Sequence, residues 1–231
     1  MGGLLVAGDA IFGTLQKLLP ALDLAAASVF ALTGALVASR KQMDIVGFMW
    51  LGVVTGVGGG TVRDLLLGTP VFWVRDVSPV VACIAAAVLA FFTAHHAQSR
   101  CRWILWLDAL GLALVTIAGA AKGLDTGTGP VVAVVMGVIT GAVGGIIRDI
   151  LGHEPSIILR REIYVTASLA GAVLFVALSG AGADRIAAAL VGGTTAFAVR
   201  CLALVYGWTL PTYRTSPGRM AEVLDRPNGM P

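Results

Sequence analysis

The chain has 231 residues, of which 57% are hydrophobic and only 13% are charged, and its mean hydropathy is +0.89. These values exclude an ordinary soluble domain and predict an all-α integral membrane protein, with membrane lipids as its surroundings. The net charge of +3, without a basic stripe among aromatic residues, argues against nucleic acid as a partner.

Seven windows are long and apolar enough to be membrane-spanning helices, which need about 20 such residues. In chain order they cover residues 18–38, 45–67, 77–94, 103–121, 131–151, 163–178 and 186–206. Residues 1–17 form an N-terminal segment that either extends the first helix or lies along the membrane interface. The sequence predicts a flexible C-terminal tail over residues 211–231, after a seventh helix placed at 186–210.

The two halves of the chain are copies of one unit. A shift of 85 residues aligns them without a gap, and the aligned pairs include Asp23 and Asp108, Thr55 and Thr140, Gly59-Gly60 and Gly144-Gly145, and Arg63-Asp64 and Arg148-Asp149. Each copy has three windows, residues 18–94 and 103–178, so the second copy must enter the membrane from the opposite side. The prediction is therefore seven transmembrane helices, arranged as two inverted three-helix repeats plus a seventh helix.

The distribution of basic residues predicts the orientation of the helices. Leaving out Arg63 and Arg148, whose depth is uncertain, four basic residues lie at helix ends on one side and ten on the other. Because basic residues are enriched on the cytoplasmic side, we expect a cytoplasmic C-terminus and an external N-terminus in a bacterial inner membrane.

Glycines cluster in the second and fifth windows, at Gly58, Gly59 and Gly60 and at Gly144 and Gly145. Glycine weakens a helix, and a break within a membrane is tolerable only against protein or a water-filled path. We interpret the clusters as kinks in two helices that cross near the bilayer centre. Freed carbonyls and the hydroxyls of Thr55 and Thr140 would then form an oxygen-rich lining for a monovalent cation. The alternative is close helix packing alone, because both clusters also contain a GxxxG pattern.

An Arg-Asp pair follows each glycine cluster. A charged residue within a membrane span usually needs a partner. Adjacent helical residues point in different directions, so we expect Arg63 near Asp149 and Arg148 near Asp64, as gates or charge filters. In the alternative reading each pair reaches the membrane interface.

Asp23 and Asp108 lie about one turn inside the first and fourth windows, near opposite faces. They either concentrate cations at the two mouths of a pore or stabilise a helix N-terminus. Lys122, at the end of the fourth window, is interpreted as an ordinary interfacial anchor, with sensing of voltage or anionic lipid as the alternative.

Motifs of soluble enzymes are absent from the sequence, which contains no P-loop, HExxH or GxSxG pattern. We therefore expect no enzymatic activity, no cofactor and no resident metal. The cysteines and histidines form no complete ligand set; they are Cys83, Cys101, Cys201, His95, His96 and His153.

The doubled signature G-G-x-x-R-D-(x5)-P, the segment R-K-Q-M-D after the first window and V-F-W-V-R after Pro70 resemble one bacterial membrane family. Its members carry the label of glycine transporters and are grouped with the trimeric intracellular cation (TRIC) channels. The similarity extends from about Asp23 to Leu210. It implies a homotrimer with a potassium-permeable pore in each protomer, bordered by the glycine-kinked second and fifth helices.

Two features depart from that family pattern. Val143 stands where the first repeat has Gly58, which makes the second kink stiffer. The lysine-bearing lipid-binding motif of the eukaryotic channels has no clear equivalent here.

The sequence leaves three functions open. The preferred one is a passive channel for monovalent cations, with potassium or sodium as permeant ions. The second is a transporter of a small amino acid such as glycine, working at the same repeat interface, and the third is a non-conducting structural protein of the membrane.

Overall fold

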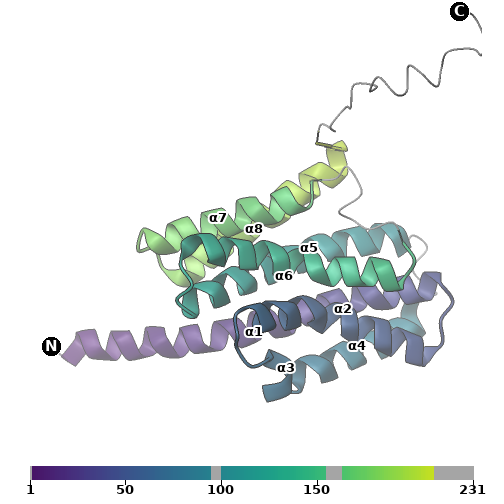
Figure 1. The fold of residues 1–231 in the computed structure, drawn as a ribbon, viewed down its shortest axis with the longest axis horizontal. Coiled ribbons are helices and arrows are strands. Elements are labelled where there is room, and N and C mark those ends of the chain that lie inside the picture. The colour runs from purple at the N-terminus through teal and green to yellow at the C-terminus, as the bar shows by residue number, and fades with distance from the viewer. Residues whose placement is uncertain (1, 95–99, 155–162, 211–231) are drawn as a thin grey trace, which may run out of the picture.

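The computed structural model describes residues 2–94, 100–154 and 163–210, and this part of the chain forms eight helices (Figure 1). His95, His96 and the tail at 211–231 lie outside the described residues. The helices are α1 (Gly2–Arg40), α2 (Ile45–Leu66), α3 (Phe72–Arg75), α4 (Ser78–Thr93), α5 (Arg100–Asp125), α6 (Pro130–Leu151), α7 (Val165–Gly180) and α8 (Arg185–Tyr206).

Five helices in the described part of the chain are long and apolar enough to cross a membrane: α1, α2, α5, α6 and α8. Two further apolar helices, α4 and α7, have 16 residues each. At a rise of 1.5 Å per residue each is about 24 Å long, slightly less than a bilayer core of about 30 Å. The four-residue helix α3 was not expected from the sequence.

The N-terminal segment continues the first helix. α1 has 39 residues in one run, so the backbone of residues 2–17 extends the predicted span. In Figure 1 the N-terminal part of α1 projects beyond the neighbouring helices.

Short polar side chains and glycines set the helix ends. The side chain of Asp44 accepts a hydrogen bond from the Gly47 N–H at 2.7 Å and caps α2, and Asp184 caps α8 through the Ala187 N–H at 2.9 Å. Such caps satisfy backbone donors that have no partner within the helix. Gly207 follows the last residue of α8, and its φ of 66° is a left-handed conformation that glycine adopts without strain.

The helices form two joined bundles. α1, α2 and α4 pack together, as do α5, α6 and α7, while α8 lies against α5 and α7. Contacts of α1 with α5 and of α2 with α6 hold the bundles side by side (Figure 1). Alanines fill much of the core, including the fully buried Ala31, Ala87, Ala120 and Ala172. Small side chains of this kind allow transmembrane helices to approach closely.

Among the described residues, many exposed side chains are large and apolar, and several buried side chains are charged. Large apolar side chains such as Trp50, Leu89 and Leu190 are exposed, whereas the side chains of Arg63, Asp64 and Arg148 are buried. A lipid-facing exterior and charges turned inward are typical of a membrane protein.

Candidate functional site

The first cluster of charges is centred on Arg63 of α2. The guanidinium group donates to both carboxylate oxygens of Asp23 on α1, at 2.7 and 3.1 Å, and its Nε donates to Asp64 Oδ1 at 2.8 Å. Lys122 of α5 lies 3.5 Å from the same Asp64 oxygen. The other oxygen of Asp64 accepts the Phe72 N–H at 2.8 Å, which fastens α3 to the end of α2. The first cluster thus joins four helices, α1, α2, α3 and α5, and balances two carboxylates with two cations.

The second cluster repeats this arrangement around Arg148 of α6. Nη1 donates to Asp108 Oδ1 of α5 at 2.7 Å, while Nε and Nη2 donate to Asp149 Oδ1 at 3.0 and 2.9 Å. Arg148 is 2% exposed and Asp108 is fully buried. Both arginines reach an aspartate 40 residues earlier in the chain.

The prediction that Arg63 pairs with Asp149 and Arg148 with Asp64 is therefore wrong, because each arginine binds the carboxylates of its own repeat. The interfacial alternative is also wrong, since Arg63 is 0% exposed. α2 and α6 pass each other in opposite directions, so the residues that follow the contact point separate instead of meeting. The adjacent Asp64 and Asp149 are reached after all, because the arginine side chain folds back along its own helix.

The point of contact between α2 and α6 lies at Gly59 and Gly144. A Cβ atom on Gly59 would collide with the Thr140 carbonyl oxygen, and one on Gly144 would lie 3.0 Å from the Thr55 carbonyl oxygen. As residue numbers rise along α2, their contacts fall along α6, so the helices are antiparallel there. Glycine permits this backbone-to-backbone contact because it lacks a side chain.

The remaining glycines of the two clusters have different neighbours. A Cβ on Gly58 would meet Ile147, one on Gly60 would meet the Phe72 ring, and one on Gly145 would face Tyr164 and Asp108. Both α2 and α6 run through their glycines as uninterrupted α-helix. The expected break with freed carbonyls is therefore not present, and close packing accounts for Gly59 and Gly144.

Thr55 and Thr140 are fully buried and turned toward neighbouring helices. Each hydroxyl donates to a carbonyl one turn earlier in its own helix, Leu51 for Thr55 and Met136 for Thr140. They lie against Gly34 and Gly119, respectively. Neither lines the cavity described next.

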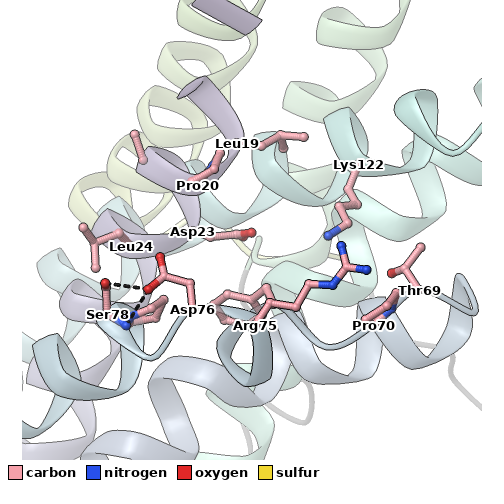
Figure 2. Close-up of a pocket in the computed structure, with 13 residues that line it drawn as sticks. Leu19, Pro20, Asp23, Leu24, Thr69, Pro70, Arg75, Asp76, Ser78 and Lys122 are labelled. Atoms are coloured by element: carbon pink, nitrogen blue, oxygen red, sulfur yellow. Dashed lines mark hydrogen bonds between the residues drawn. The ribbon is translucent and has the colours of Figure 1, made fainter. Parts of the chain in front are cut away.

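A cavity of about 520 Å³ opens beside the first cluster (Figure 2). Asp23 forms part of its wall, and Arg75 and Lys122 point into it from α3 and α5. Asp76 lies at its edge, where hydrogen bonds from the Ser78 hydroxyl and N–H lower the pKa of the Asp76 carboxyl. The cavity lies next to the charges of the first cluster, at one end of the α2–α6 crossing, and is large enough to hold water.

The two aspartates expected at pore mouths lie deeper than predicted. Asp23 is 7% exposed and Asp108 0%, and both are bound to arginine. Neither sits at a helix N-terminus, because α1 begins at Gly2 and α5 at Arg100. Asp23 retains contact with the cavity wall, and Asp108 lies in the interior.

Sequence reasoning missed the partner of Asp64. Lys122 was interpreted as an anchor, yet its ammonium joins the first cluster. The equivalent residue of the first repeat is Val37, so a lysine at position 122 is a difference between the repeats, and this difference could have drawn attention to Lys122. Tyr164 and Arg200 were also missed; the Arg200 guanidinium carbon lies 5.1 Å from the centre of the buried Tyr164 ring.

The chain is similar to known proteins in both sequence and fold. A family model described as glycine transporter matches twice, over residues 20–95 and 105–180. The UPF0126 inner membrane protein YadS of Escherichia coli strain K12 is 40% identical over 195 residues, which cover 83% of this chain and 94% of that protein.

Solved structures of TRIC channels are similar to this chain as well. A TRIC trimeric intracellular cation channel orthologue from Rhodobacter sphaeroides is 56% identical, with a TM-score of 0.80 over 82% of this chain and 98% of that one. Another TRIC cation channel, studied for its conductance, is 29% identical with a TM-score of 0.76 over 86% of this chain and 98% of the other. The chain is therefore a multi-pass membrane protein of the glycine transporter family, with the fold of the TRIC cation channels.

Proposed function

We propose that this protein is a cation channel permeable to potassium and, less favourably, to sodium. The observation that carries the proposal is the 56% identity to a TRIC channel over most of the chain. The buried charge clusters agree with it, because ionisable groups inside a membrane protein commonly mark ion pathways.

The proposed path runs through each protomer, between the two repeats, and passes the α2–α6 crossing. The first cluster lies on one side of the crossing and the second on the other, since the two helices are antiparallel there. The 520 Å³ cavity at Asp23 and Lys122 would serve as the entrance on one side. The contact of Gly59 with Thr140 and Gly144 would be the narrowest point, so conduction requires α2 and α6 to move apart.

The proposed topology has seven membrane spans. α1, α2 and α4 form one three-helix unit, α5, α6 and α7 form its inverted copy, and α8 is the seventh span. In the proposed orientation the C-terminus is cytoplasmic and the N-terminus external, which the excess of basic residues on one side supports. A reporter fused after Pro231 that matured only outside the cytoplasm would contradict this orientation.

Single-protein recording in planar bilayers tests the channel directly. We expect unitary potassium currents from the purified protein in liposome-derived bilayers, since passive conduction moves many ions per opening. Saturable uptake of glycine without such currents would instead support the glycine transporter that the family label names. Neither currents nor uptake would favour a structural role.

A further inference from the structure

A chain of polar side chains crosses the interior of the α5–α6–α7 bundle. Thr116 and Ser168 have their hydroxyl oxygens 2.7 Å apart, and the Tyr164 hydroxyl donates to the Gly141 carbonyl at 3.4 Å. Asp108 lies two turns before Thr116 on α5. None of these four side chains belongs to a residue more than 1% exposed. We call Asp108, Thr116, Tyr164 and Ser168 the polar seam.

The first repeat has no such seam. The residues equivalent to Thr116, Tyr164 and Ser168 under the shift of 85 are Ala31, Pro79 and Cys83. Ala31 and Cys83 are fully buried in an apolar cluster with Val57. The seam is therefore a difference between two bundles whose arginine clusters and crossing glycines correspond.

One carboxylate oxygen of Asp108 has no partner in the part of the chain that the structure describes. Its Oδ1 accepts from Arg148, but its Oδ2 is buried and has no hydrogen-bond partner among the described residues. In the first repeat both oxygens of Asp23 accept from Arg63. A buried acceptor without a partner is costly, and ordered water commonly satisfies such groups.

Polar groups surround Gly145, which carries no side chain. The position where a Cβ would stand is 3.1 Å from the Tyr164 hydroxyl oxygen, 3.7 Å from Asp108 Oδ1 and 3.8 Å from Arg148 Nη2. A water molecule in this region would meet several polar groups, as buried waters do. Arg148 and Arg200 both lie close, so a neutral guest suits the seam better than another cation.

We propose that the polar seam binds ordered water that solvates the Oδ2 atom of Asp108, whereas the equivalent apolar positions around Ala31 and Cys83 in the α1–α2–α4 bundle bind none. This site lies within one bundle, and Asp108 links it to the second cluster, which flanks the path proposed between the repeats.

The two equivalent positions 83 and 168 give a matched test. The first variant replaces Cys101 and Cys201 by alanine and keeps Cys83 as the only thiol. The second variant adds Cys83→Ala and Ser168→Cys, so that the only thiol is in the seam. Both are exposed to silver ions in liposomes, and the remaining free thiol is counted by maleimide labelling after denaturation.

Water should let silver reach the thiol at position 168 and keep that thiol more reactive than one in an apolar site, giving a rate at least about tenfold faster than at Cys83. Adding Thr116→Ala or Tyr164→Phe should slow the reaction toward the Cys83 rate. Equal, slow reaction at 83 and 168 in folded protein would overturn the proposal. If Ser168→Cys does not fold, Thr116→Cys and Ala31→Cys form a second matched pair with the same expected difference.

The result does not depend on whether the protein conducts. If position 168 reacts with silver but no potassium currents are recorded, the hydrated seam is supported and the channel proposal is contradicted. If currents are recorded but neither thiol reacts, the channel proposal is supported and the hydrated seam is contradicted.

Discussion

At the scale of residues, Arg63 and Arg148 are the centres around which the interior is organised. Each binds one aspartate next to it and one on the preceding long helix, at a separation of 40 residues. A buried charge is tolerated only when it is paired and hydrogen-bonded. The arginines therefore fix how α2 lies on α1 and how α6 lies on α5.

A double-mutant cycle tests this pairing. We expect Arg63→Ala and Asp23→Ala to be strongly coupled, by about 1–3 kcal/mol in the free energy of unfolding, because removing either one leaves the other buried without its partner. Chemical unfolding in detergent micelles measures the four proteins of the cycle.

The cycle of Arg63→Ala with Asp149→Ala is the matched control. These residues belong to different clusters, so their effects should add to within about 0.5 kcal/mol. Strong coupling in the control, with none between Arg63 and Asp23, would restore pairing across the repeats.

At the scale of elements, the α2–α6 crossing depends on two missing side chains. The carbonyl of Thr140 occupies the place where a Cβ of Gly59 would stand, and the Thr55 carbonyl lies close to that of Gly144. A helix interior normally gains about 1 kcal/mol when glycine becomes alanine. At this crossing that gain in stability is opposed by the steric clash between the new Cβ atom and the carbonyl group of the facing helix.

We expect Gly59→Ala to destabilise the protein by about 1–3 kcal/mol instead of stabilising it, because the added methyl group overpacks the crossing. Gly144→Ala should destabilise less, since its Cβ would lie 3.0 Å from the nearest atom. The thermal midpoint in micelles ranks the variants.

Gly180→Ala at the end of α7 provides the control, because a Cβ there meets nothing within 4 Å. It should leave the midpoint unchanged or raise it. A Gly59→Ala protein as stable as this control would mean that α2 and α6 do not touch at Gly59.

At the scale of the whole molecule, the proposal of one path per protomer has a consequence for the assembly. Three protomers with separate paths conduct independently, whereas one shared central pore opens or closes as a unit. The family resemblance supports a homotrimer, and the α2–α6 crossing lies within a single chain.

We therefore expect recordings from single trimers to show three equal and independent conductance levels. Co-expression of wild-type chains with Gly59→Leu chains should yield trimers with three, two, one or no wild-type levels, because the larger side chain acts only on its own path. A single conductance level that all three chains alter together would place the pore on the trimer axis.

The amino-acid sequence was enough to predict the membrane class, the register of the repeat and the Arg-Asp motifs, because composition and spacing are properties of the chain. It also located the glycines at which α2 and α6 meet. It misjudged what those glycines do, since a run of glycines is compatible with a broken helix and with a close contact between intact helices.

The partners of the buried charges could be identified only from the packed helices. Partner choice depends on the direction and rotation of packed helices, and the antiparallel crossing carries Arg63 and Asp149 apart while Asp23 faces Arg63. Lys122 and the polar seam were likewise hidden, because the repeat alignment compares equivalent positions but does not say which of them are neighbours in space.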